Sequence, residues 1–487
     1  MRTGPEELLD HLQSPRGRGR CPDGAFTGAA GGAACGDLIR VSLAIDTDGA
    51  DGAIVDAGFD ASGCGATFAA GSAAVSLLRG RSLLDAARIG PADIAEELGG
   101  LSHGKRHAAE LAADALHRAL GGAARHRAAL SVSAGRTLVA MSGGVDSAVA
   151  ALLIARQAEA VGVTLELWSD PENDGDLSCC SAQAVRGARE LAHRIGMPHL
   201  SIDLRAEFRA GVVDGWLSDH ARGLTPNPCV RCNGRVRLDA MIDLADRLGC
   251  ETLATGHYAR VQAADGADRP LLRMAADERK DQSYVLAALS PRSLARMRFP
   301  LGDMPKTEVR RVAAEAGLAV ARKRDSQDLC FLAGTRHADF LERHAGLGRR
   351  PGPIVDLHGS VLGQHGGAHA FTIGQRHGLG IGSTAPLYVL STDVGSNTVT
   401  VGPRERLLTG TIEARDLTLR CRGDRVDAVR VRSHGERIAC GLSRRLAAGR
   451  HEKVQIELAR PAERTAPGQI ACLYSGDLVA GYATVAA

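Results

Sequence analysis

A short apolar run that meets a glycine turn and then a helical pattern constrains the fold most strongly. Residues 136–147 read Arg-Thr-Leu-Val-Ala-Met-Ser-Gly-Gly-Val-Asp-Ser. A glycine turn between a buried strand and a helix suits an anion, because unpaired N–H groups and the helix dipole point at it. The turn lacks the Gly-Lys-Ser/Thr ending of a Walker A loop. The sequence therefore predicts a different phosphate loop, and the plainer alternative is an ordinary glycine-rich turn.

Strand-like and helical segments alternate after this loop. The strand-like runs are 137–141, 160–167, 199–203 and 252–255. The helical patterns are 147–157, 182–195, 208–220 and 236–248. This alternation predicts a parallel, doubly wound sheet that binds ligands at the carboxyl ends of its strands.

The remaining segments divide the 487 residues into further parts. In front of the sheet we expect a polar arm (1–20), an α+β domain (21–120) and a Gly/Ala/Ser/Arg-rich linker (121–135). The α/β domain would span 136–298, followed by a small central domain (299–370) and a C-terminal β-barrel or sandwich (371–487). The predicted fold class is therefore multidomain.

Composition limits the compartment more than the partners. The formal net charge is +3, which neither demands nor excludes nucleic acid. The basic residues are overwhelmingly Arg, for which a general composition bias is a plainer explanation than phosphate recognition. With no apolar stretch long enough for a membrane span or a signal peptide, we expect a cytoplasmic protein without membrane contact. Twelve cysteines in such a chain favour metal or sulfur chemistry over structural disulfides.

Three cysteines stand in polar frames. Thr225-Pro-Asn-Pro-Cys-Val-Arg-Cys-Asn233 contains a CxxC pair, Cys229 and Cys232, just before a helical pattern, with a basic residue between the thiols. That position predicts thiols that ionise easily. A CxxC alone fits a redox pair, half of a zinc site or iron–sulfur ligands. Instead of a second CxxC the sequence offers Cys330, in Asp325-Ser-Gln-Asp-Leu-Cys330.

From residue 136 to the C-terminus the chain resembles the bacterial tRNA-uridine 2-sulfurtransferases, or tRNA-specific 2-thiouridylases. These enzymes place sulfur at C2 of the wobble uridine of certain tRNAs. The resemblance rests on ordered motifs: the SGGVDS loop, the CxxC segment, Ala254-Thr-Gly-His-Tyr258, Arg279-Lys-Asp-Gln-Ser-Tyr284, the Cys330 segment, and Thr372-Ile-Gly-Gln-Arg-His-Gly-Leu-Gly380. It implies an ATP-pyrophosphatase (PP-loop) domain for the predicted sheet.

The resemblance also implies roles for particular residues. ATP, with Mg²⁺, would be bound by Ala140, Met141, Ser142, Gly143, Gly144, Val145, Asp146, Ser147, Leu165 and Gly256. Contacts with tRNA would be made by Asn227, Pro228 and Cys229 beside the target base, and by Lys280, Asp281, Gln282, Arg430 and Arg432.

The implied reaction adenylates the C2 oxygen of uridine, and sulfur then displaces AMP. The sulfur would come from a persulfide on catalytic Cys330, supplied by a cysteine desulfurase or another donor, with catalytic Cys232 releasing it through a transient disulfide. Alternatively, Cys229, Cys232 and Cys330 hold a 4Fe–4S cluster. Many family members have DxxC here, and the additional thiolate of this chain favours the cluster.

The front block resembles the NifU-like or IscU-type iron–sulfur scaffold domain. The matching ligands are Cys35, Asp37, Cys64 and His107. The family's third cysteine is replaced by Ala108. This departure leaves two interpretations: a working scaffold for iron–sulfur clusters, or a degenerate domain that binds zinc or docks a desulfurase.

Two other functions compete with tRNA thiolation. Another PP-loop adenylating ligase would leave the three cysteines and the β-rich C-terminal part without a role. An iron–sulfur or persulfide carrier that merely binds tRNA would not need the SGGVDS loop. We therefore expect an ATP-dependent tRNA sulfurtransferase.

Overall fold

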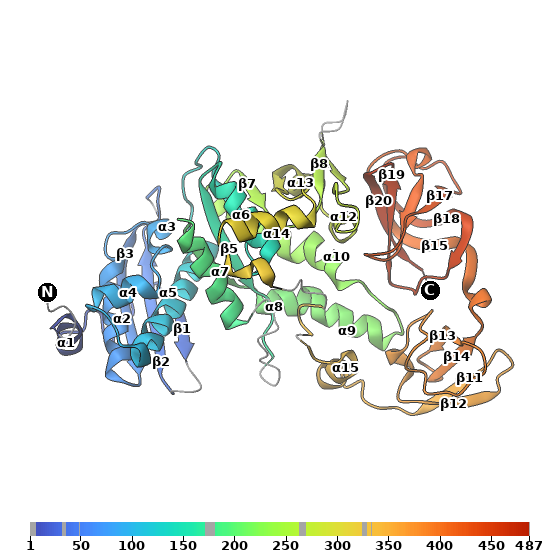
Figure 1. Cartoon of the computed structure of the whole chain (residues 1–487), viewed down its shortest axis with the longest axis horizontal. Coiled ribbons are helices and arrows are strands. Elements are labelled where there is room, and N and C mark those ends of the chain that lie inside the picture. The colour runs from blue at the N-terminus through green and yellow to red at the C-terminus, as the bar shows by residue number, and fades with distance from the viewer. Residues whose placement is uncertain are drawn as a thin grey trace.

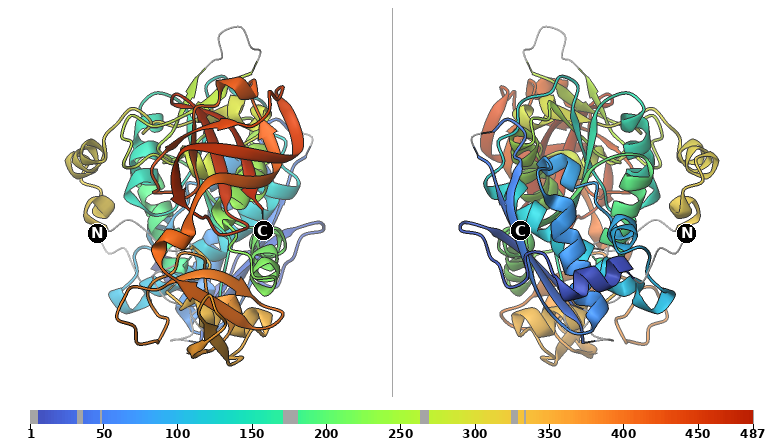
Figure 2. Two further views of the ribbon diagram at one scale, coloured as in Figure 1. Left: turned by 90° about the vertical axis from the view of Figure 1, so that its right-hand side faces the viewer. Right: turned by 90° about the vertical axis from the view of Figure 1, so that its left-hand side faces the viewer.

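The computed structural model describes residues 6–31, 36–47, 49–170, 181–262, 269–323, 329–332 and 334–486, with only the backbone of Arg235. An N-terminal α+β domain lies at one end of the long axis, a sheet domain in the middle, and two β units at the other end (Figure 1). Views along that axis show the N-terminal domain and the β units on opposite sides of the sheet domain (Figure 2). The predicted multidomain fold class is confirmed.

The N-terminal domain is a three-stranded antiparallel sheet covered by helices. Its elements are α1 (Glu6–Gln13), β1 (Phe26–Gly31), β2 (Leu38–Ile45), β3 (Ile54–Ser62), α2 (Gly65–Leu78), α3 (Leu83–Ala86), α4 (Pro91–Glu97), η1 (His103–Lys105) and α5 (Arg106–His126). Small side chains bring the layers close together. A Cβ on Gly71 of α2, for example, would lie 2.3 Å from the Phe59 ring of β3. This domain therefore builds its core largely from alanine.

The sheet domain has five parallel strands in the order β10-β7-β4-β5-β6. The strands are β4 (Thr137–Ala140), β5 (Ala160–Glu166), β6 (His199–Asp203), β7 (Thr252–Ala254) and β10 (Met297–Arg298). The helices between them are α6 (Val145–Ala155), α7 (Ala182–Arg194), α8 (Arg205–Phe208), η2 (Arg209–Val213), α9 (Asp214–Ala221), α10 (Pro228–Cys232), η3 (Asn233–Arg237), α11 (Leu238–Arg247), α12 (Ser283–Leu286) and α13 (Pro291–Arg296). The chain moves to one side of β4 for β5 and β6, and to the other side for β7 and β10. The carboxyl end of β4 is therefore the switch point where such sheets bind ligands.

Helix α5 joins the N-terminal domain to the sheet domain, because it packs against both β1 and the outer strand β6. It continues to His126, so the first part of the segment predicted as a linker is helical. The close approach explains the glycine there. A Cβ on Gly121 would lie 1.9 Å from the carbonyl oxygen of Ser201 in β6.

Buried polar contacts reinforce this junction. Asp114 of α5 accepts hydrogen bonds from Arg186 and Arg189 of α7, both at 2.7 Å, and the Arg189 side chain is only 2% exposed. His117 of α5 places Nδ1 2.9 Å from the His199 carbonyl oxygen, and burial lowers the pKa of this histidine well below its usual value. Ion-paired and uncharged polar groups thus fix the two domains as one body.

The chain after β10 stays with the sheet domain. Helix α14 (Lys306–Glu315) packs on α6 through Val309 and Ala313. It is followed by η4 (Ala319–Arg322) and α15 (His337–Ala345). The predicted boundary at 298/299 therefore differs from the packing, which keeps residues 299–323 on the sheet domain.

Two β units complete the chain. The smaller has the strand order β12-β11-β14-β13 and consists of β11 (Gly352–Val355), β12 (Val361–His365), η5 (Ala368–Ala370), β13 (Tyr388–Asp393) and β14 (Thr398–Gly402). This sheet crosses the boundary expected at 370/371.

The C-terminal unit is a closed barrel, because β15 pairs with both β18 and β20. It comprises η6 (Arg404–Leu407), β15 (Leu408–Leu419), η7 (Gly423–Arg425), β16 (Ala428–Arg430), β17 (Ile438–Leu442), β18 (Gly449–Glu463), β19 (Ile470–Ser475) and β20 (Leu478–Val485). A hairpin from the sheet domain, β8 (Arg260–Gln262) and β9 (Leu271–Arg273), pairs with β20. The barrel is thereby attached to the sheet domain by backbone hydrogen bonds.

Candidate active site

The predicted phosphate loop leads from β4 into α6. Gly143 has φ +67°, a conformation that favours glycine, and Gly144 is the N-cap of α6. The hydroxyl of Ser147 accepts the Ser142 N–H at 3.1 Å and donates to the Gly144 carbonyl at 3.1 Å. The loop is thus closed on itself, beside the positive end of the α6 dipole.

Residues on or just after the neighbouring strands β5 and β7 lie beside the loop. Gly256, just after β7, approaches so closely that a Cβ would lie 2.6 Å from the Ser147 nitrogen. Leu165 of β5 and Ala140 and Met141 before the loop are buried, at 7%, 4% and 3% exposure. The structure therefore places Gly256 against the loop, and Leu165 two residues beyond Val163, the residue of β5 that pairs with Ala140.

A charged network surrounds Asp146 in the first turn of α6. Its carboxylate accepts bonds from Lys306 Nζ at 2.7 and 2.8 Å and from the Tyr258 hydroxyl at 2.8 Å. The backbone N–H of Lys306 donates to Asp277 at 3.1 Å, which fixes the start of α14. Sequence reasoning missed Lys306. The rarity of lysine could have singled this residue out, since only five of the 59 Lys and Arg residues are lysines.

The CxxC pair lies on the short helix α10. The Asn227 side chain caps this helix by accepting the N–H groups of Cys229 and Val230 at 3.1 and 3.3 Å. Cys232 is 8% exposed and Cys229 is half-buried. Burial raises the pKa of the Cys229 thiol, and the nearby Arg237 charge only partly opposes this. The expectation that Cys229 ionises easily is therefore wrong, because the effect of burial exceeds that of the Arg237 charge.

Cys330 is half-buried on the same apolar core that contains Cys232. The next residue, Phe331, is 2% exposed, with its ring centroid 5.2 Å from that of Trp216 and 5.3 Å from that of Phe340. These aromatic contacts anchor the Cys330 segment beside the sheet domain. Asp325–Asp328 of this motif lie outside the described residues.

The residues assigned to tRNA divide into exposed and buried ones. Arg432 is exposed, while Lys280 and Gln282 are half-buried. Asp281 and Arg430 are 3% and 6% exposed and bond each other at 2.7 Å. The predicted tRNA contacts of Asp281 and Arg430 are therefore not supported, because this buried ion pair joins the sheet domain to the barrel.

The N-terminal domain brings together three of its four predicted metal ligands. The ligand atoms of Asp37, Cys64 and His107 lie within 4.8 Å of one another, the one such group of three or more among the described residues. His107 Nε2 is 3.2 Å and Cys64 Sγ 3.4 Å from Asp37 Oδ2. The hydrogen bond from Thr67 is the largest cause that lowers the pKa of Asp37. Cys35 lies outside the described residues, and Ala108 is fully buried.

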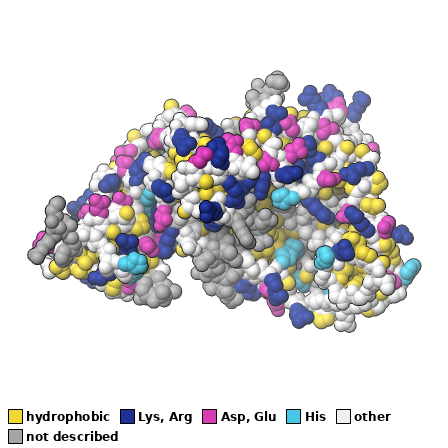
Figure 3. Space-filling model, viewed as in Figure 1, with side chains coloured by type: hydrophobic (Ala, Val, Ile, Leu, Met, Phe, Trp, Pro, Cys, Tyr) yellow, Lys and Arg dark blue, Asp and Glu magenta, His cyan; other side chains and the backbone are white. Residues whose placement is uncertain are grey.

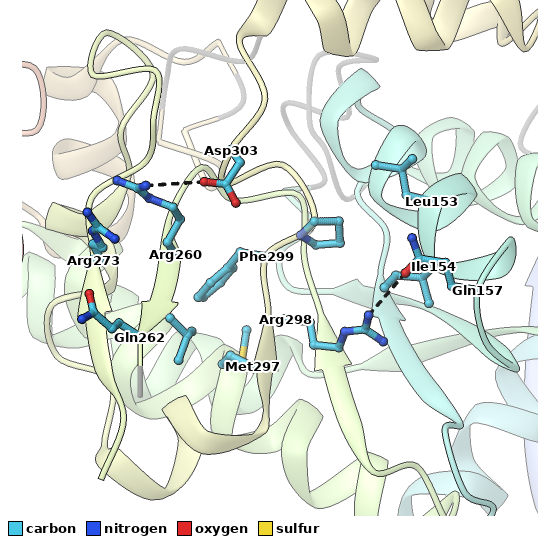
Figure 4. Close-up of a pocket in the computed structure, with 12 residues that line it drawn as sticks. Leu153, Ile154, Gln157, Arg260, Gln262, Arg273, Met297, Arg298, Phe299 and Asp303 are labelled. Carbon is cyan, nitrogen blue, oxygen red and sulfur yellow. Dashed lines mark hydrogen bonds and ion pairs between the residues drawn. The ribbon is translucent and has the colours of Figure 1, made fainter. Parts of the chain in front are cut away.

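A pocket of about 840 Å³ lies along the edge of the sheet, separate from these sites. Arg260 and Arg273 from the β8–β9 hairpin face Arg298 of β10 and Gln157 after α6 across it (Figure 4). Asp303 and Gln157 bond two of these arginines. None of the predicted site residues lines this pocket.

Basic side chains mark one face of the molecule. Lys and Arg residues gather there over the middle of the chain, between the sheet domain and the barrel (Figure 3). Among the described residues, no helix has the length and apolar character needed to cross a membrane.

Four family models cover most of the chain. The NifU-like N terminal domain matches residues 4–128, and the tRNA methyl transferase HUP domain matches 135–334. The tRNA methyl transferase PRC-barrel domain matches 338–403, and the aminomethyltransferase beta-barrel domain matches 419–485.

Curated relatives match all or most of the chain. The Bifunctional protein NifU/MnmA of Rubrobacter xylanophilus is 43% identical over 98% of this chain and 96% of its own length. The tRNA-specific 2-thiouridylases MnmA of Thermobifida fusca and Geobacter metallireducens are 45% and 40% identical. They cover 72% and 71% of this chain and 95% of their own lengths.

Proposed function

We propose that this chain, which belongs to the family of bifunctional NifU/MnmA proteins, is an ATP-dependent tRNA-uridine 2-sulfurtransferase that acts on the wobble uridine. The observation that carries the proposal is the closed loop at the switch point of the sheet, in the same domain as the Cys229/Cys232 pair. A small-molecule ligase needs the loop but not the thiols.

ATP would place its phosphates against the N–H groups of the loop and the N-terminus of α6. The C2 oxygen of uridine then attacks the α-phosphorus, pyrophosphate leaves, and N3 loses its proton. Sulfur adds at C2 and expels AMP. Asp146 offers oxygen ligands of the kind that Mg²⁺ prefers, and the bound ion would neutralise phosphate charge.

Cys229, Cys232 and Cys330 would supply the sulfur side of the site. Three thiols from two chain segments are soft donors of the kind that binds a 4Fe–4S cluster, and each is free of disulfide bonding. Such a cluster would supply inorganic sulfide for the transfer.

The alternative route uses a persulfide on Cys330 and a transient disulfide with Cys232. In this route Cys229 is dispensable, so the variant Cys229→Ala separates the two. Anaerobically purified protein is assayed for iron, sulfide and 2-thiouridine formation. Loss of both cluster and activity supports the cluster route, whereas full activity of iron-free protein with a cysteine desulfurase refutes it.

The N-terminal site of Asp37, Cys64 and His107 supports a second function, binding of zinc or an iron–sulfur cluster. The buried Ala108 removes the family's usual third thiol, which favours metal binding over independent cluster assembly. Metal analysis of a Cys64→Ala, His107→Ala double variant tests this, since unchanged metal content would refute it.

Incubation of the protein with ATP, unmodified tRNA and a sulfur source tests the main proposal. We expect 2-thiouridine in the digested tRNA together with AMP and pyrophosphate. In cells that lack the protein, unchanged 2-thiouridine would refute the proposal.

A further inference from the structure

Lysine is distributed unevenly in this chain. The five lysines are Lys105, Lys280, Lys306, Lys323 and Lys453. Two of them reach the phosphate loop: Lys306 bonds Asp146, and Lys323 Nζ donates to the Gly143 carbonyl at 3.0 Å. In a chain with 59 Lys and Arg residues, of which only five are lysines, two lysines at the loop indicate a requirement that arginine does not meet.

We propose that Lys306 is a phosphate-binding residue, which holds Asp146 before ATP binds and neutralises the departing pyrophosphate during adenylation. This role rests on the proposed function. It adds a residue on α14, outside the loop, to the ATP site.

The position of Lys306 is fixed on every side. Its side chain is 11% exposed, and its ammonium group lies 5.7 Å from the centre of the Tyr258 ring. Asp277 holds its backbone N–H, and α14 packs on α6. The cation is therefore preorganised beside the N-terminal turn of α6, the place where the loop would receive phosphate.

The chemistry of lysine suits an exchange of partners. An ammonium group is a compact charge whose donors turn about one bond, whereas the guanidinium of arginine is a rigid planar fork. Lys306 can thus turn from the Asp146 carboxylate toward a phosphate oxygen while Asp277 holds its backbone N–H.

In the adenylation step, the bond between the uridine C2 oxygen and the α-phosphorus forms as the bond from that phosphorus to the pyrophosphate oxygen breaks. The electron pair of the broken bond stays on pyrophosphate, and the uridine N3 proton passes to solvent. Negative charge therefore grows on the leaving group, where a fixed cation lowers the barrier.

The test compares Lys306→Arg and Lys306→Met with Lys453→Arg, which changes an exposed lysine on β18. Full-length proteins are assayed for pyrophosphate release with ATP and tRNA, for ATP affinity by calorimetry, and for thermal unfolding. We expect Lys306→Arg to keep the unfolding temperature, because it can still pair with Asp146. Its rate of pyrophosphate release should fall by about tenfold or more, because the rigid guanidinium fork stays on Asp146 and does not turn toward the leaving pyrophosphate. Lys453→Arg should match the unmodified protein.

Wild-type pyrophosphate release and ATP affinity in Lys306→Arg and Lys306→Met would overturn the inference. Failure of the proposed function gives a different result. If the unmodified protein binds ATP without forming 2-thiouridine, that function is wrong. Weakened ATP binding in Lys306→Met then still supports the phosphate-binding role.

Discussion

Two adjacent glycines of α5 should respond oppositely to the same substitution. Gly121 faces β6, where a Cβ would meet the Ser201 carbonyl oxygen at 1.9 Å. Gly122 faces Phe26, whose nearest atom would lie at an ordinary 3.5 Å. Both sit inside one helix, so Gly122→Ala is a matched control for Gly121→Ala.

The expected magnitudes follow from two effects. Alanine is favoured over glycine within a helix by about 1 kcal/mol, and both variants gain this. Overpacking costs about 1–3 kcal/mol, and a clash with backbone belongs at the upper end. Gly122→Ala should therefore be more stable by up to about 1 kcal/mol, and Gly121→Ala less stable by about 2 kcal/mol.

Calorimetric unfolding of the full chain measures the effect. For a cooperative unit of about 150–250 residues, the midpoint temperature of unfolding should rise by about 2–4 °C in Gly122→Ala and fall by about 4–8 °C in Gly121→Ala. Amide hydrogen exchange in β6 should become faster only in Gly121→Ala, because only that variant separates α5 from the strand. Equal stabilisation of both variants would refute the close packing of the two domains.

Three further outcomes are expected. Arg430→Met should lower the free energy of unfolding by about 3 kcal/mol or more, because it leaves the buried Asp281 carboxylate without its ion-pair partner. The salt dependence of tRNA binding should stay unchanged. A smaller salt dependence in the variant would show that Arg430 contacts a tRNA phosphate. The rate of Cys229 alkylation, measured by mass spectrometry, should still increase above pH 9, the usual pKa of a thiol, because burial raises the pKa of this residue. A rate that reaches its plateau below pH 9 would contradict the raised pKa. Burial depresses the pKa of both His117 and His199, so their neutral forms stabilise the folded chain fully above about pH 6.5 and progressively less as the pH falls below it. Unfolding midpoints that stay constant from pH 8 to pH 5 would contradict this, and His117→Gln should reduce the slope.

Local signals in the sequence were sufficient for the loop and for four of the five parallel strands. Short apolar runs predicted β4, β5, β6 and β7, and the glycines at 143 and 144 predicted the turn, because both depend on neighbouring residues. The two-residue strand β10 (Met297–Arg298) was not predicted, because it is too short to give a run of its own. Pairings between distant segments could not be predicted this way. Lys306 is 160 residues from Asp146, and Arg430 is 149 residues from Asp281.

Burial in the folded chain explains the other differences between the predictions from sequence and the structure. A CxxC at a helix start predicts reactive thiols, but the pKa of Cys229 depends on what the folded chain packs around it. Likewise the composition of 121–135 predicted a linker, whereas glycine at 121 serves a close helix–strand contact. The same residue type has two uses, and only tertiary packing distinguishes them.

The placement of α5 between two domains has a consequence for biosynthesis. The helix ends at His126, but its partner β6 ends only at Asp203. At usual synthesis rates the ribosome needs roughly 4–16 s to make the intervening residues. During that interval the N-terminal domain presents the docking face of α5, and the emerging sheet then assembles on a surface that already exists. The order of the fusion thus makes the first domain a folding template for the second.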